Sequence, residues 1–162
     1  MRFFRFLFVF GLLVSAVRAE VELIRVWPGY RTADSFVGIG EYFGGEERTR
    51  GRQIRRSQPA ERGGYYWLVR VRSAVAVPEA LLELQVIRPG QPDPETHRFP
   101  CALKPGSQPI LVGLTGDDWP EAEVAPTAWH VRLLDPTGAT LAAEGSFLWS
   151  TPAAPLPDPA GS

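Results

Sequence analysis

The feature that most constrains the fold is a strict alternation of side chains in residues 65–72. Tyr65, Trp67, Val69 and Val71 fall on one side of an extended chain, whereas Arg70 and Arg72 fall on the other. Because successive side chains of a β-strand point to opposite faces, this pattern is typical of a strand with one buried face. Such a strand needs a second apolar layer to pack against.

Six other segments have a strand-like pattern: residues 21–27, 81–87, 96–103, 110–114, 129–134 and 140–149. We expect the first to end at Pro28 and Gly29. The last two are expected to form a hairpin through residues 135–138, because this stretch combines a proline with a glycine that is free to adopt φ > 0. Phe147 and Trp149 would then extend the aromatic core. Many short strands between turns predict a mostly β fold, an antiparallel sandwich.

Three stretches depart from the strand pattern. Phe36, Ile39 and Phe43 recur at helical spacing after Thr32, a candidate N-cap, and predict one short helix. Residues 44–64 are rich in Gly, Arg, Glu and Ser with a single aliphatic residue, and predict a long arginine-rich loop. Residues 151–162 are rich in proline and alanine without a periodic apolar face, and predict a disordered tail.

The N-terminus has the three parts of an export signal. Arg2 and Arg5 precede an apolar run at residues 6–14, and small residues follow, with Val17 and Ala19 at the positions that signal peptidase recognises. We therefore expect residues 1–19 to be a signal peptide that is cleaved after Ala19, and the mature chain to be periplasmic or extracellular without a membrane span. An uncleaved N-terminal anchor is the competing interpretation. Residues 20–150 then form a single β-sandwich domain.

The predicted arrangement resembles an immunoglobulin-like or fibronectin-type-III-like domain. The resemblance depends on Trp67 within its strand and on the closing hairpin at residues 129–138, and it extends over most of residues 21–149. The cysteine pair of antibody domains is absent, since Cys101 is the only cysteine. The resemblance implies adhesion, scaffolding or binding more often than catalysis, although fold alone does not fix function.

Charge and chemistry narrow the function further. The 19 signal residues carry three arginines and no acid, so cleavage moves the net charge from −1 to −4. A mildly acidic domain lacks the basic footprint of a nucleic-acid binder.

His97 and Cys101 lie about 13 Å apart along a strand, too far for a nucleophile and its base. With two histidines and one cysteine there is no zinc spacing, and we expect no metal, no cofactor and no enzyme activity. Cys101 is interpreted as a buried small hydrophobic residue, with an intermolecular disulfide as the alternative.

The first candidate binding site is the arginine-rich loop. Its arginines outnumber Glu46, Glu47 and Glu61 and are Arg48, Arg50, Arg52, Arg55, Arg56 and Arg62. Guanidinium groups bind carboxylates and phosphates in a bidentate manner, so the expected partner is a protein or an anionic envelope component, such as a surface polysaccharide or phospholipid. A solvated loop without a partner is the alternative. Arg70 and Arg72 are expected to point outward, and no function is assigned to them.

The second candidate is a carbohydrate-binding module centred on Trp119. A loop tryptophan beside Asp117 and Asp118 can stack on a sugar ring while the carboxylates accept hydrogen bonds from its hydroxyls, with Trp27 and Tyr30 as further contacts. A third hypothesis is a small hydrolase that uses Asp117 and Asp118 as its carboxylate pair. Two simpler interpretations remain open: the acidic residues form a solvated loop, and Trp119 folds back to close the end of the core.

Overall fold

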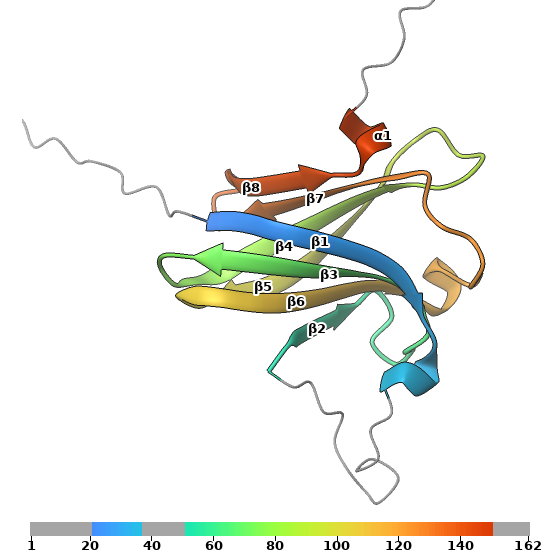
Figure 1. Ribbon diagram of the computed structural model, residues 1–162, viewed down its shortest axis with the longest axis horizontal. Helices are drawn as coiled ribbons and strands as arrows, with labels where there is room; N and C mark the ends of the chain where they lie inside the picture. The colour runs from blue at the N-terminus through green and yellow to red at the C-terminus, as the bar shows by residue number, and fades with distance from the viewer. Residues whose placement is uncertain (1–20, 37–50, 151–162) are drawn as a thin grey trace, which may run out of the picture.

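The fold is a sandwich of two four-stranded β-sheets, seen in a computed structural model that describes residues 21–36 and 51–150 (Figure 1). The first sheet has the strand order β1 (Val21–Arg31), β3 (Gly64–Ser73), β6 (Gly106–Thr115) and β2 (Gln53–Arg56). The second sheet has the order β5 (Glu95–Leu103), β4 (Val77–Ile87), β7 (Ala128–Leu134) and β8 (Thr140–Gly145). All neighbouring strands are antiparallel except β2 and β6, which are parallel. The predicted mostly β sandwich is therefore confirmed.

The core fills the space between the sheets. The predicted apolar face of β3 is buried, with Trp67, Val69 and Val71 each fully inaccessible. It packs with the inner residues of β4, β6 and β7, which include Leu84 and Val131. Each large apolar side chain that is removed from water in this way contributes about 1.5–3 kcal/mol. The core is thus the main source of stability that keeps the two sheets together.

The first strand continues beyond the point at which we expected it to end. β1 includes Pro28 and Gly29, which pair with Trp67 and Tyr66 of β3. The prediction was wrong because β1 is an edge strand, and a proline without a backbone donor is tolerated where only one side of the strand forms a ladder. The β1–β3 register also shifts between Leu23 and Arg25, which leaves Ile24 as a β-bulge without a partner.

The predicted closing hairpin is confirmed, but its second strand is shorter than expected. Gly138 adopts φ = +85°, and Oδ1 of Asp135 accepts hydrogen bonds from the backbone N–H groups of Thr137 and Ala139. β8 then ends at Gly145, and Phe147–Ser150 form a single helical turn, α1. Phe147 is 83% exposed and does not extend the core. The ladder ends at Ser146, where Oγ instead of the backbone carbonyl accepts from the Trp129 N–H, and the Ser146 carbonyl accepts from the Trp149 N–H of α1.

The predicted long loop contains a strand in its described part. β2 lies within this segment, where few apolar residues signal a strand. All four of its residues pair with β6, and the Gln53 side-chain amide also donates to the Ala102 carbonyl of β5 and accepts from the Ala102 N–H, at 2.6 and 3.1 Å. Residues 44–50 of the predicted loop lie outside the described part of the chain.

The helix predicted after Thr32 is only partly described. Ala33–Phe36 form a 3₁₀ turn, whereas Ile39 and Phe43 lie outside the described residues. The predicted signal peptide (residues 1–19) and tail (residues 151–162) also lie outside them. Within the described ranges, the structure contains no helix that is long and apolar enough to cross a membrane.

Candidate binding surface

The arginines of the predicted loop lie in different environments. Arg48 and Arg50 are outside the described residues. Arg55 donates from Nε to the Pro100 carbonyl at 2.8 Å and so connects β2 to β5, while Arg52 is half-buried. The described members therefore do not converge on one anion site.

Arg56 and Arg62 belong instead to a small aromatic cluster on the outer side of the first sheet. The Arg56 guanidinium lies 5.0 Å from the centre of the Phe36 ring, and its Nε donates to the Tyr66 hydroxyl at 2.9 Å. That hydroxyl in turn donates to the Arg62 carbonyl at 2.7 Å. These contacts hold the segment against the sheet, so at least part of the arginine content stabilises the fold.

Trp119 closes the end of the core. It is 2% exposed, and its ring centre lies 5.2 Å from that of Tyr65 and 6.5 Å from that of Trp67. Its indole N–H donates to the Val124 carbonyl at 3.1 Å, and the Arg88 guanidinium lies 4.4 Å from its ring centre. With its faces occupied by protein, the ring has no free surface for stacking on a sugar. Trp119 therefore folds back onto the end of the core, which is one of the two roles that the sequence left open for it.

The other residues of the carbohydrate hypothesis do not form a platform with Trp119. Asp117 and Asp118 lie in a 3₁₀ turn, Gly116–Asp118, where Asp117 is exposed and Arg88 bonds the Asp118 carbonyl. Trp27 and Tyr30 lie on β1, but Tyr30 packs against the core whereas Trp27 is 41% exposed on the outer face. The structure therefore separates these five residues into buried and exposed groups.

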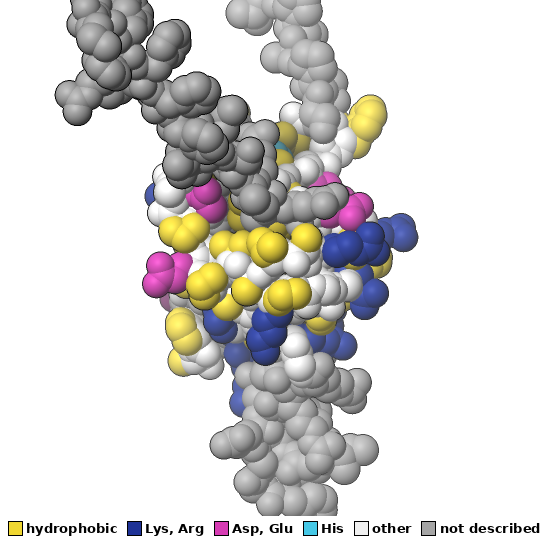
Figure 2. All heavy atoms as spheres, turned by 90° about the vertical axis from the view of Figure 1, so that its left-hand side faces the viewer, with side chains coloured by type: hydrophobic (Ala, Val, Ile, Leu, Met, Phe, Trp, Pro, Cys, Tyr) yellow, Lys and Arg dark blue, Asp and Glu magenta, His cyan; other side chains and the backbone are white. Residues whose placement is uncertain are grey.

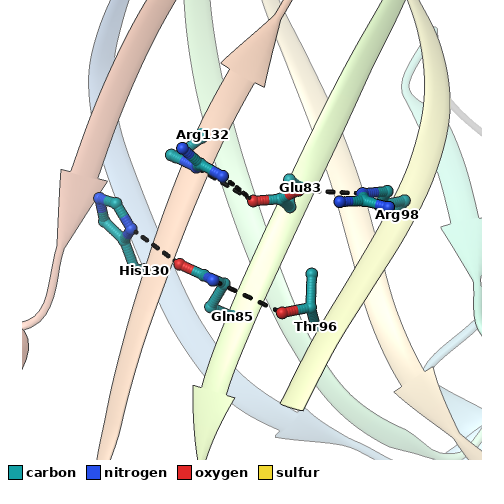
Figure 3. A network of polar contacts seen from close by, with 6 residues as sticks. All are labelled: Glu83, Gln85, Thr96, Arg98, His130 and Arg132. Carbon is teal, nitrogen blue, oxygen red and sulfur yellow. Dashed lines mark hydrogen bonds and ion pairs between the residues drawn. The ribbon is translucent and has the colours of Figure 1, made fainter. Parts of the chain in front are cut away.

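The second sheet carries a polar network on its outer face (Figure 3). Glu83 of β4 is flanked by its cross-strand neighbours Arg98 and Arg132 and is only 1% exposed. Arg98 Nε donates to Glu83 Oε2 at 2.9 Å, and Arg132 Nε donates to Oε1 at 3.0 Å. Burial by itself raises the pKa of Glu83, but the hydrogen bonds and positive charges of Arg132 and Arg98 outweigh it and hold the pKa below its usual value.

The neighbouring row of this network is also satisfied internally. Gln85 lies between Thr96 and His130, with 3.3 Å between its Oε1 and His130 Nδ1 and 3.5 Å between its Nε2 and Thr96 Oγ1. The His130 ring stacks on Trp149 of α1 at 5.2 Å. Burial, and then the charge of Arg132, lower the pKa of His130 and favour its neutral form. The polar groups on this face bond mainly with one another, and few of them are available to bind a partner.

Cys101 is buried, as the sequence predicted. It is 4% exposed on the inner face of β5, and burial raises its pKa to about 11. The thiol is therefore protonated at neutral pH and is a poor nucleophile. His97 faces Glu95 on the same strand, with 3.5 Å between Nε2 and Oε2. Among the residues that the structure describes, no group of three or more His, Cys, Asp or Glu side chains is placed to hold a metal ion.

The described surface has two hollows, and neither lies on the outer face of the first sheet. The larger, about 530 Å³, is an open depression beside β4 and β5 lined by Pro78, Leu81, Pro100 and Pro136 among others. The smaller, about 290 Å³, is lined by Arg88, Trp119 and Val124 among others. In neither hollow do described polar groups form a recognisable catalytic arrangement.

A cationic surface on the first sheet is the most distinctive arrangement that the structure adds to the sequence. Arg25 of β1 lies directly opposite Arg70 of β3, and Arg72 follows two residues further along β3. All three are exposed. Like charges that face each other across two strands destabilise a sheet, and among the described residues Arg70 has no acidic partner. Arg72 pairs with Glu22 at 3.3 Å. Burial raises the pKa of Glu144 on β8, and the nearby charge of Arg25 opposes that rise.

Exposed apolar side chains accompany these arginines. Arg25 and Trp27 share one face of β1 by the ordinary alternation of a strand, and the bulge at Ile24 turns that face outward. The Arg25 guanidinium lies 5.3 Å from the centre of the Trp27 ring. Ile24 is 37% exposed and Trp27 is 41% exposed. We call the set of Ile24, Arg25, Trp27, Arg70 and Arg72 the cationic face. Sequence reasoning placed Arg70 and Arg72 outward but missed this face, because the bulge and the Arg25–Arg70 pairing appear only with the strand register.

Comparison with known proteins gives no further information about function. No protein-family model matches the chain, and no curated protein matches it, so the argument for function rests on the geometry of the chain itself.

Proposed function

We propose that this chain is an exported, non-enzymatic binding domain that contacts an anionic component of the cell envelope through the cationic face. The observation that carries the proposal is the Arg25–Arg70 pair, which places two exposed like charges opposite each other on a chain with an overall negative charge. An anionic partner removes the repulsion between the two guanidinium groups on binding. Their forked donors fit carboxylates and phosphates.

The strand order supports a relationship to immunoglobulin-like sandwiches, which often serve as binding domains. In the constant type, strands A, B, E and D form one sheet and C, F and G form the other. Here β1, β3 and β6 correspond to A, B and E, and β4, β7 and β8 correspond to C, F and G. β2 occupies the edge position of strand D but is parallel to its neighbour and precedes β3 in the sequence, which is a departure from that pattern.

Charge reversal at Arg70 tests the proposal. We expect residues 20–162 to sediment with isolated cell envelopes at low salt and to be released as the salt concentration rises, because exposed charges are screened within about 10 Å at 0.1 M. Arg70→Glu should weaken this association at least fivefold, since each arginine near an anionic surface contributes about 1 kcal/mol.

Arg31→Glu is the matched control. Arg31 lies at the opposite end of β1 and undergoes the same change of charge. It should leave the association within about twofold of the unmodified domain. Equal losses in the two variants, or association that is insensitive to salt, would show that the cationic face is not the contact surface.

A further inference from the structure

We infer that the anionic component is the surface of a lipid bilayer, and that the domain contacts it with the end of the sandwich at which β1 begins. This inference rests on the proposed function and names the partner of the same surface. The proposed contact surface consists of the cationic face together with an apolar turn, residues 74–76, and Lys104.

The apolar turn connects β3 to β4. Ala74, Val75 and Ala76 are all exposed, and Val75 is 40% exposed. The Ser73 hydroxyl donates to the Val75 carbonyl at 2.6 Å, which gives this turn a fixed internal contact. A turn of three consecutive exposed apolar residues loses apolar surface to water when it enters the boundary between headgroups and acyl chains.

The strand register places the turn and Lys104 at this end, and the cationic face runs from it along β1 and β3 as far as Trp27, which pairs with Leu68. Ser73 pairs with Val21 at the start of β1 and with Gly106 at the start of β6. Val77, which follows the turn, pairs with Leu103, so the exposed Lys104 lies in the adjacent β5–β6 turn. Figure 2 views the molecule from this end and shows apolar side chains gathered in the middle, Lys and Arg side chains at the lower and right-hand margins, and Asp and Glu side chains at the left and upper right.

The combination fits a bilayer better than it fits a folded acidic partner. The larger hollow lies at this end of the sandwich but on the side of β4 and β5, and the smaller one lies at the opposite end, beside Arg88 and Trp119. No residue of the cationic face lines either hollow, so neither gives that face a pocket for the anchor side chain that usually dominates protein–protein recognition. A bilayer needs no pocket: arginine and lysine interact with anionic headgroups, and tryptophan is favoured at the membrane–water interface. Trp27, Ile24 and Val75 supply the apolar part, and Arg25, Arg70, Arg72 and Lys104 supply the charge.

The chain enters the domain at the same end. Residues 1–20, which contain the apolar run at residues 6–14, precede Val21 directly (Figure 1). A chain threaded through a membrane by that run would present this end of the folded domain to the bilayer first. The contact proposed here is made by residues 21–106 and does not require the run to be retained.

Vesicle flotation tests the inference on residues 20–162. We expect the protein to float with phosphatidylcholine vesicles that contain phosphatidylglycerol, to stay unbound with phosphatidylcholine alone, and to be released by salt. Arg70→Glu and Val75→Glu should each reduce the floated fraction at least fivefold. Their controls are Arg31→Glu and Leu148→Glu, which change an arginine at the far end of β1 and an exposed apolar residue of α1.

The outcomes separate this inference from the proposed function. Failure to float with anionic vesicles, while envelopes retain the domain in an Arg70-dependent way even after lipid extraction, would overturn the bilayer as partner and leave an acidic protein or polysaccharide in its place. Loss of binding to both vesicles and envelopes would overturn both proposals. Equal effects of Val75→Glu and Leu148→Glu would overturn the role of the apolar turn.

Discussion

Replacement of Trp119 by alanine is expected to lower the free energy of unfolding by about 3–5 kcal/mol, the range found for large aromatic side chains removed from a core. Trp119 is 2% exposed and contacts Tyr65 and Trp67, so its loss leaves a cavity at the end of the sandwich. It also leaves the Val124 carbonyl without the indole donor. Urea unfolding followed by circular dichroism measures the change.

Trp27→Ala is the matched control for this experiment. Trp27 is 41% exposed on an edge strand, and its removal should cost less than about 1 kcal/mol, as is usual for surface positions. Should Trp119→Ala fail to fold, Trp119→Phe retains most of the ring volume and should lower stability by a smaller, measurable amount. Wild-type stability in Trp119→Ala would contradict the assignment of this residue to the core and would restore it as a candidate ligand contact.

Glu83→Gln is expected to lower the free energy of unfolding by about 1.5–3 kcal/mol at neutral pH, the contribution of hydrogen bonds to charged groups. The carboxylate is 1% exposed and receives donors from Arg98 and Arg132, whereas an amide offers only one acceptor oxygen to the two arginines. Glu22→Gln is the control, because the Glu22–Arg72 pair lies at the surface with side chains 59% and 62% exposed. An exposed pair of this kind contributes about 0–1 kcal/mol.

The comparison of wild type with Glu83→Gln also predicts how stability depends on pH. The folded-state pKa of Glu83 lies below its unfolded value of about 4.3, so its contribution is complete above that value and is lost as the pH falls through the folded pKa. The stability difference between wild type and Glu83→Gln should therefore shrink when urea unfolding is repeated at progressively more acidic pH. A difference that stays constant on acidification would contradict the charged Arg98–Glu83–Arg132 arrangement.

The strands that were predictable from sequence are those that bury one face. In β3 and β7 apolar residues alternate with polar ones, because one side packs on the core and the other contacts solvent. β2 has no such pattern, since its backbone pairs with β6 and its Gln53 and Arg55 side chains bond the backbone of β5. Local periodicity does not reveal a strand that is stabilised by hydrogen bonds to residues far away in the sequence.

The candidate binding surface was less predictable than the fold. Arg70 and Arg72 were placed outward correctly, but the position of Arg25 opposite Arg70 depends on the bulge at Ile24, which interrupts the alternation of β1. Glu83 lies between two leucines, and its burial depends on arginines from β5 and β7. For Trp119 the sequence left two environments open, because a tryptophan beside acidic residues suits both an exposed loop and the end of a core.

The most direct measurement of the central claim uses the five tryptophans of the chain as reporters. The indole ¹H–¹⁵N signals of residues 20–162 are assigned by single substitutions and followed during titration with bicelles that contain phosphatidylglycerol. The account predicts that the Trp27 signal shifts or broadens first, whereas the signals of Trp67 and Trp119, which are 0% and 2% exposed, remain unchanged. A perturbed Trp119 signal beside an unchanged Trp27 signal would contradict the cationic face as the contact surface.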